Sequence, residues 1–371
     1  MKAILRSGRS LHLPASGVLL QRGQPRRLAT AAEYVYLSAA HSHRVELQPL
    51  PRLVNLTRDE QQQRAAPWQL DELTEQGWRS RPLEDALDAA DRVLVIRNMG
   101  LGDVLMLTPA LQALHQQWQV SVEVATYARY VPLLWGLPGI AAAHALGTDY
   151  QAERFDAAID LNWAVESGEE IHRRPRQDIF ARLLHVRLNQ RCPIYQVAGS
   201  ERRWARQRLV QWHPPMIGIQ VHASCRQRSY PAAHIATLTQ LLQAEGYTVA
   251  FLGERWKGST PPQVVDLTGC LSLRQAAALI EQMAAMICPD SGLLHLAVAV
   301  GTPTVGLFGP IPPRLRTAGY PHCQAVTVVD ACPHQPCFDS GAAGCRKPYC
   351  MQAIEPQSVI EAMHTVLASD S

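Results

Sequence analysis

From residue 91 onward, short β-branched runs alternate with longer segments whose apolar residues recur at helical spacing. "RVLVIR" at 92–97 is followed by "PALQALHQQW", and "MIGIQV" at 216–221 is followed by "HIATLTQLLQAEG". Strands that alternate with helices of this length are typical of a parallel sheet with crossover helices. The pattern therefore predicts an α/β fold.

The alternation is interrupted over 196–215 by a charged helical segment that ends in Pro-Pro. We interpret this interruption as a hinge between two α/β domains, an N-terminal one over 91–212 and a C-terminal one over 213–354. The pattern of "EPQSVIEAMHTVLA" then predicts a final amphipathic helix within 355–371. A length of 371 residues, about twice that of a typical domain, agrees with two sizeable cores.

Residues 1–90 form a predicted N-terminal extension, whose sequence lacks the alternation of strands and helices that begins at residue 91. β-like pieces ("SLHLP", "GVLLQ", "EYVYLSAA", "HRVELQPL") are separated by Gly, Pro and Arg, and a polar segment with helical character follows over 57–77. A small β module with a linking helix is the prediction. The first 32 residues hold six Lys or Arg and no acid, a composition that suits an ordered basic appendage better than a targeting peptide, because no apolar signal-peptide core follows.

Composition narrows the class of protein. An apolar content of 47% and a charged content of 18% suit a soluble globular chain, and a net charge of +3 gives no basis for nucleic-acid binding. No apolar run approaches the ~18–20 residues of a membrane helix, so membrane contact is expected to be peripheral at most. We expect the chain in the cytoplasm, up to the inner face of the cytoplasmic membrane, with homo-oligomer formation left open.

The loop at 98–103 lies between a predicted strand and a predicted helix. Gly100 and Gly102 begin a G-x-G-x-x-G pattern, but Leu105 stands where the third glycine belongs. Asp103 also argues against a phosphate here, because a carboxylate at a helix start competes for the same amides. Two interpretations stand: a tight turn with a helix-start charge, or a general base beyond the carboxyl end of a parallel strand. Thr108-Pro109 predicts an N-cap that starts or restarts the helix.

The second segment with candidate functional residues is "ICPDSGLLHLAVAVGTPTVGLFGP". Asp290 is placed to cap a helix whose first amides, after Ser291 and Gly292, point outward with the positive end of the helix dipole. His295 follows about one turn later. This is an anion site in one interpretation and a capped helix with a half-buried core histidine in the other.

Together, "VLVIRNMGLGDVLMLTPALQAL" and the block from "VDLTGC" to "TVGLFGP" resemble glycosyltransferase family 9, the lipopolysaccharide heptosyltransferases. The similarity runs from about 91 to 363, and residues 1–90 have no counterpart that we recognise. The resemblance implies a GT-B architecture of two facing Rossmann-like domains, with the last helix crossing back to the first. It also implies inverting transfer of a heptose from a nucleotide-diphosphate sugar, usually ADP-heptose, to a glycan such as lipopolysaccharide core.

The resemblance assigns roles to particular residues. Asp103, beside Gly102, is implied to be the base. The implied donor-binding residues are Asp290, Ser291, Gly292 and His295 for the diphosphate, Arg228 in "RQRSYP" for the phosphates with Arg226 as its alternative, and Glu254 in "FLGER" for the ribose. No D-x-D sequence occurs, so the chemistry is expected to be independent of metal and to need no cofactor.

Acceptor contacts are expected from the loop after "FDAAIDLN", which offers Asn162, Glu166, Arg173, Arg174 and Arg176. The basic "HRRPR" suits a phosphorylated or acidic acceptor and equally suits a plain solvated loop. The acceptor is a glycan by family default, and a protein acceptor of the autotransporter type is an alternative. A sugar-nucleotide epimerase and a catalytically degenerate assembly protein are further alternatives, the latter opposed by the intact Asp103 and D-S-G-x-x-H element.

Five of the nine cysteines crowd into one short segment. Four of them, Cys332, Cys337, Cys345 and Cys350, lie in a Gly/Pro-rich stretch and could close a tetrahedral zinc or iron site, although their spacing is looser than that of C-x₂-C pairs. Relatives in the family carry a similar Cys-rich stretch. A structural metal, free thiols and disulfides stay open, and the absence of a signal peptide disfavours the last.

Overall fold

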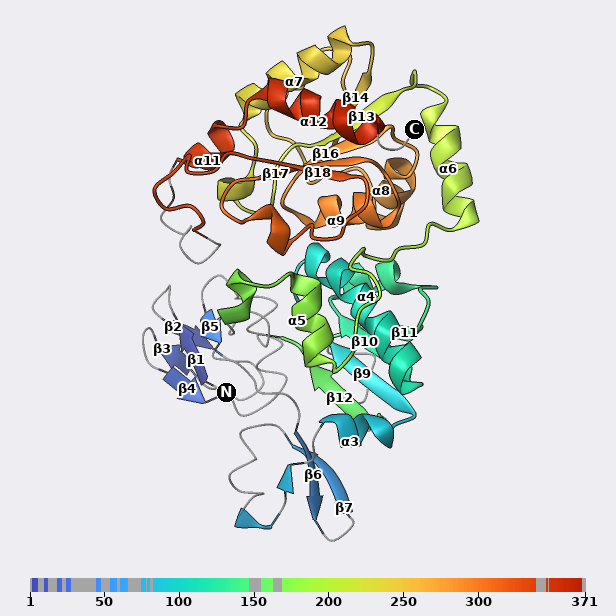
Figure 1. Cartoon of the computed structure of the whole chain (residues 1–371), viewed down its shortest axis with the longest axis vertical. Coiled ribbons are helices and arrows are strands. Elements are labelled where there is room, and N and C mark those ends of the chain that lie inside the picture. Colours follow the sequence, from blue (N-terminus) through green and yellow to red (C-terminus); the bar gives the residue numbers. More distant parts are fainter. Residues whose placement is uncertain are drawn as a thin grey trace. The chain divides into compact units, whose positions relative to one another are not determined.

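The computed structural model describes residues 75–77, 83–146, 155–162, 169–337, 345 and 347–368, together with the backbone of eight short strands before residue 81 (Figure 1). Contacts divide the chain into two compact units. Unit 1 comprises 1–99, 110–171 and 179–188, and unit 2 comprises 100–109, 172–178 and 189–371.

The N-terminal strands pair antiparallel in three small sheets, with orders β4-β1-β5, β2-β3 and β7-β6-β8. The strands are β1 (Lys2–Leu5), β2 (Ser10–His12), β3 (Leu19–Gln21), β4 (Pro25–Arg27), β5 (Val45–Leu47), β6 (Val54–Arg58), β7 (Gln61–Ala65) and β8 (Arg79–Ser80). The predicted β-rich start is confirmed at these strands. The predicted strand "EYVYLSAA" lies outside the described residues.

The helix predicted over 57–77 is wrong where β6 and β7 form a hairpin, with Arg58 paired to Gln61. The physical reason lies in the period of the pattern. Val54 and Leu56 alternate with polar neighbours, and a period of two residues is typical of a strand rather than a helix. The polar residues that follow form the second strand of the hairpin, where backbone hydrogen bonds to β6 pair their N–H and C=O groups. The helix α3 (Leu83–Asp88) occurs further along the chain.

The large sheet of unit 1 is parallel, with order β11-β10-β9-β12. Its strands are β9 (Arg92–Ile96), β10 (Ser121–Thr126), β11 (Ile140–Ala145) and β12 (Ala157–Asp160). Consecutive side chains of β9 and β12 are buried, as expected for strands covered on both faces. Around them lie η2 (Ala128–Leu134), η4 (Glu169–His172) and α5 (Arg176–Leu183).

Helix α4 (Leu101–Trp118) follows β9 and begins at Leu101, so Thr108-Pro109 lies inside the helix and does not start it. Pro109 lies inside this helix and has no N–H to donate to the carbonyl of Leu105. The hydroxyl of Thr108 donates to that carbonyl instead, at 2.7 Å, and accepts the backbone N–H of Ile194. Thr108 therefore repairs a break in the helix rather than capping its start.

The sheet of unit 2 is also parallel, with order β15-β14-β13-β16-β17-β18. Its strands are β13 (Met216–Gln220), β14 (Thr248–Leu252), β15 (Val265–Asp266), β16 (Ala285–Pro289), β17 (Thr304–Phe308) and β18 (Cys323–Thr327). In chain order this is 3-2-1-4-5-6, the doubly wound arrangement that binds nucleotides in many proteins.

Figure 1 shows α7 and α12 over one face of this sheet and α8 and α9 over the other. The elements beside the strands are α6 (Gly199–Leu209), η5 (Arg226–Arg228), α7 (Ala232–Ala244), α8 (Leu273–Ile280), α9 (Gly292–Ala299), η6 (Pro313–Leu315), α11 (Tyr349–Gln352) and α12 (Pro356–Ala368). None of the helices in the described part of the chain is long and apolar enough to cross a membrane.

Two predictions about the C-terminal half need correction. The resemblance implied that the last helix crosses back to the first domain, whereas Val359, Ile360 and Met363 of α12 lie in the apolar core of unit 2. The predicted boundary at 212/213 also moves, because α6 groups with unit 2. Arg202 of α6 binds Glu281 at the end of α8 at 2.7 Å, so the charged helix is part of that unit rather than a hinge.

Candidate active site

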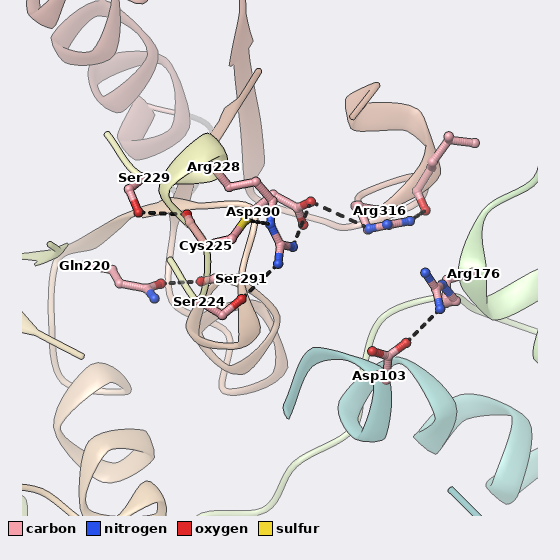
Figure 2. A network of polar contacts seen from close by, with 11 residues as sticks. Asp103, Arg176, Gln220, Ser224, Cys225, Arg228, Ser229, Asp290, Ser291 and Arg316 are labelled. Carbon is pink, nitrogen blue, oxygen red and sulfur yellow. Dashed lines mark hydrogen bonds and ion pairs between the residues drawn. The ribbon is translucent and has the colours of Figure 1, made fainter. Parts of the chain in front are cut away.

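The carboxyl ends of β13 and β16 form the point of unit 2 where the strand order reverses, and open α/β sheets bind ligands at such a point. Gln220 ends β13, and Ser291 follows β16. The hydroxyl of Ser291 donates to Oε1 of Gln220, so the two strand ends are joined by a side-chain hydrogen bond (Figure 2). The site is thus built on rigid strand termini.

Asp290 is buried between two arginines. Its Oδ2 lies 3.5 Å from Nη1 of Arg228 and 3.7 Å from Nε of Arg316. Asp290 was predicted to cap α9, but Ser291 occupies the N-cap position and Asp290 binds the guanidinium groups instead. Two guanidinium groups and one carboxylate give the surroundings of Asp290 a net positive charge, which favours the binding of an anion.

Arg228 is held by its own loop. Its Nη2 donates to the hydroxyl of Ser224 at 2.9 Å, and its Nε donates to the sulfur of Cys225 at 3.2 Å (Figure 2). Arg226, the alternative phosphate contact, has an exposed side chain. The structure therefore brings Arg228 to Asp290.

Arg316 was not foreseen from the sequence. It is buried and follows η6, in the segment after the carboxyl end of β17. The only signal available was its position after a strand next to β16 in the sheet. The ion pair between Arg316 and Asp290 depends on the tertiary fold, so it could not be predicted from the sequence.

His295 is 2% exposed, and its Nδ1 lies 2.8 Å from the hydroxyl of Tyr320. Burial lowers the pKa of His295 to about 4, although the nearby carboxylates of Asp290 and Asp103 act in the opposite direction. The ring is therefore neutral at pH 7. A Cβ added at Gly102 would lie 2.7 Å from Cδ2 of this ring, so only glycine lets α4 approach it so closely.

Asp103 lies in the first turn of α4 and binds Arg176 of α5, with Nη1 2.9 Å from Oδ1 (Figure 2). The side chain of Asp103 is 20% exposed while that of Arg176 is 8% exposed. A carboxylate that is oriented by a guanidinium and still reaches solvent can accept a proton from a bound hydroxyl. Gly292, at the start of α9, lies against Leu101, so the first turns of α4 and α9 are neighbours in unit 2.

The other predicted residues are placed as follows. Asn162 is buried in unit 1, where its Oδ1 accepts the N–H of Asn98 at 2.7 Å, so it holds the loop after β9. Arg173 and Arg174 are exposed, and Arg314 donates to the carbonyl of Arg173. Glu166 lies outside the described residues.

Glu254 is exposed two residues beyond β14. β14 is the neighbour of β13, and an acid at this position of a doubly wound sheet binds the ribose hydroxyls of a nucleotide. Gly253 just before it has a φ of +113°, a conformation that favours glycine.

The predicted metal site falls in the cysteine segment, where Cys332, Cys337, Cys345 and Cys350 are among the described residues. All nine cysteines are free thiols. Burial first, and the neighbouring thiols of Cys337, Cys332 and Cys345 after it, raise the pKa of Cys350. Within the described ranges no group of three or more His, Cys, Asp or Glu is arranged to hold a metal ion.

Comparisons with solved structures define the fold. The chain is similar to ADP-heptose lps heptosyltransferase II from E. coli, with a TM-score of 0.62 and 20% identity over 75% of this chain and 99% of that chain. It is also similar to the iron-containing dodecameric glycosyltransferase TibC from enterotoxigenic E. coli, with a TM-score of 0.59 and 17% identity over 76% and 77%. The fold is that of the GT-B glycosyltransferases, as predicted.

Sequence comparisons find similarity to one family. Glycosyltransferase family 9 (heptosyltransferase) matches residues 176–344, a range that begins after the first motif block. Lipooligosaccharide heptosyltransferase 2 of Haemophilus influenzae is 30% identical over 132 residues, 32% of this chain and 38% of that protein. The chain spans about two fifths of the length of the curated relatives it matches. The resemblance to family 9 is confirmed over residues 176–344, where the chain is similar to heptosyltransferases.

Proposed function

We propose that this protein is an inverting glycosyltransferase that moves a heptose from a nucleotide-diphosphate sugar, ADP-heptose, to a hydroxyl of a glycan acceptor. One observation carries the proposal. In unit 2, the first turn of α4, with Asp103, lies beside the first turn of α9, with Gly292 and His295. A proton acceptor and an anion site are therefore neighbours, as a displacement at a sugar carbon requires.

The reaction follows from these positions. Asp103 takes the proton of the acceptor hydroxyl as the hydroxyl oxygen attacks C1 of the sugar. The bond from C1 to the phosphate oxygen breaks on the opposite face, which inverts the configuration, and its electron pair leaves with the nucleoside diphosphate. The growing negative charge is stabilised by Arg228, Arg316 and the amides at the N-terminus of α9. No cofactor is required for this chemistry.

Further residues are proposed to contact the donor and the acceptor. Glu254, beyond β14, binds the ribose of the donor. Arg173 and Arg174 lie in the exposed segment just before Arg176, and their charges suit the phosphates or acids of a lipopolysaccharide core. Asn162 contributes by holding the loop after β9, since its Oδ1 is already bonded.

The setting of the reaction follows from the proposed substrates. The proposed action on a lipopolysaccharide core suits a protein that acts in the cytoplasm, at the inner face of the membrane. Homo-oligomer formation stays a prediction, which light scattering of the purified protein tests. A structural zinc or iron held by the four thiols of 332–350 also stays a prediction. Metal analysis of the purified chain, with Cys337→Ser as the control, tests it.

The decisive experiment for the activity is nucleotide release from ADP-heptose, with and without a lipopolysaccharide core that lacks heptose. A transferase releases ADP faster when the acceptor is present and extends the glycan by one heptose. Conversion of the free sugar nucleotide without an acceptor would instead indicate an epimerase. No turnover would contradict a lipopolysaccharide acceptor and would favour a protein acceptor or an assembly protein. A thermal-shift screen of nucleotide sugars identifies the donor independently of the acceptor, because a ligand that binds the folded state raises the melting temperature.

A further inference from the structure

Gln177 is a fully buried amide whose orientation is fixed by a carbonyl. Its Nε2 lies 3.3 Å from the backbone oxygen of Arg191 and 3.0 Å from the hydroxyl of Tyr320. A carbonyl oxygen only accepts, so the amide atom that faces Arg191 must be the nitrogen. The same nitrogen then donates to the oxygen of Tyr320.

This orientation sets the direction of the next hydrogen bond. The Tyr320 oxygen accepts from Gln177, and among the residues that the structure describes its other hydrogen-bonding neighbour is Nδ1 of His295, at 2.8 Å. The hydroxyl proton of Tyr320 therefore points at Nδ1, which accepts it. In a neutral imidazole one nitrogen accepts and the other carries the proton, so the proton of His295 lies on Nε2.

Three observations agree with a neutral, firmly held ring. His295 is 2% exposed, and burial keeps its pKa near 4. The ring is packed edge-on to Tyr320, with centroids 5.8 Å apart. Gly102 lies against its Cδ2–Nε2 edge, since a Cβ there would be 3.3 Å from Nε2.

We propose that Gln177 and Tyr320 are positioning residues that fix His295 with its proton on Nε2, so that His295 serves as a neutral hydrogen-bond donor to the leaving diphosphate rather than as an acid. The diphosphate as the acceptor of this bond rests on the proposed function, whereas the position of the proton does not. Gln177 follows directly after Arg176, so one turn of α5 orients both the base Asp103 and the donor-side His295.

The position of the proton is tested by NMR at pH 7 on protein labelled with ¹⁵N in its histidine rings. Long-range proton–nitrogen correlations distinguish the two neutral tautomers, and the resonances of His295 are those lost in His295→Gln. We expect a protonated Nε2 and a bare Nδ1. A proton on Nδ1, or on both nitrogens, would overturn the proposal whether or not the protein is a heptosyltransferase.

The positioning role is tested by Tyr320→Phe and Gln177→Met, with ADP release from ADP-heptose as the readout. Each is expected to lower kcat about tenfold and to leave the KM for ADP-heptose unchanged, because charge on the diphosphate develops in the transition state. Tyr195→Phe is the matched control, since Tyr195 is another buried tyrosine of unit 2, and it is expected to keep the wild-type kcat.

Melting temperatures separate positioning from folding. If Tyr320→Phe fails to fold, Gln177→Met decides the question, because it keeps the ring of Tyr320. Variants that fold and retain the wild-type kcat would contradict the role of the two residues. A wild-type protein that releases no ADP would contradict the proposed function, while the NMR result would still decide where the proton lies.

Discussion

Arg176 binds the carboxylate of Asp103, with Nη1 2.9 Å from Oδ1, although 73 residues separate them in the sequence. The guanidinium is almost buried and the carboxylate is partly exposed, so the pair has one fixed partner and one that faces the site. Arg176 was predicted only as one member of a basic acceptor loop. Its contact gives it a second role, which is to orient the proposed base.

Replacing Arg176 with Met should therefore lower kcat by roughly 10–100-fold, in line with losing a charged hydrogen bond to a catalytic group. The affinity for ADP should change little, because Arg176 pairs with Asp103, whereas the proposed phosphate site is formed by Asp290, Arg228 and Arg316. Steady-state kinetics and calorimetry with ADP measure the two effects. Arg206→Met, which removes an exposed charge from α6, is the control and should leave both values unchanged.

Gly102→Ala should destabilise unit 2 and reduce turnover. The new Cβ would lie 2.7 Å from the buried ring of His295, which Tyr320 holds in place, and overpacking of this kind costs about 1–3 kcal/mol. Chemical denaturation and ADP release measure the loss. Gly199→Ala is the matched control, because its Cβ would meet only Arg203 at an ordinary 3.7 Å, and it should be neutral or slightly stabilising. Equal stability and equal turnover of the two variants would contradict the close approach of Gly102 to the ring of His295.

Arg316→Met should weaken ADP binding about as much as Arg228→Met, roughly tenfold each, because both guanidinium groups lie within 4 Å of Asp290 at the proposed phosphate site. Arg314→Met is the control, since Arg314 is exposed two residues away and should change the Kd little. Calorimetric titration with ADP gives the three values. A wild-type Kd for ADP in Arg316→Met would show that Arg316 does not bind the nucleotide.

Asp160→Asn should stabilise unit 1 at pH 8 and lose this advantage progressively as the pH falls from about 6 to about 4. Burial raises the pKa of Asp160 to about 6, although the backbone N–H of Asn162 and the charge of Arg97 favour its ionised form. A raised acid pKa means that the folded state binds the proton more tightly, so stability falls as pH rises from about 4 to 6. The shift of about two units corresponds to about 3 kcal/mol as an upper bound.

Denaturation of wild type and Asp160→Asn at pH 5 and pH 8 measures this difference. Asn keeps the acceptor oxygen for the N–H of Asn162, so packing alone should contribute little. A stability difference that does not change between the two pH values would show that Asp160 is ionised in the folded protein at both.

Much of the fold could be predicted from the sequence because both sheets are parallel and buried. Strands such as β16 and β17 are buried at every position, which leaves continuous apolar runs that are easily read. Thr108-Pro109 has the local signature of a helix start, although it lies inside α4, so the sequence alone did not distinguish a start from a continuation. The carbonyl that Thr108 binds became evident only in three dimensions.

The site could be predicted only where its residues lie in short motifs. Asp103, Asp290 and His295 each stand at a strand-to-helix junction, so the sequence indicates their place. Arg316, Tyr320 and Gln177 come from other segments and reach the site through the tertiary fold. Their residue types carry no local pattern, so the sequence alone gave no reason to choose them.

The central claim is that Asp103 removes the acceptor proton while a separate anion site holds the nucleotide. ADP release from ADP-heptose in the presence of the acceptor, measured with Asp103→Asn beside an ADP titration, tests it most directly. We expect kcat to fall by ~10²–10⁴ with the Kd for ADP unchanged, since general-base catalysis contributes a factor of that size. An Asp103→Asn protein that keeps its turnover but no longer binds ADP would contradict the account.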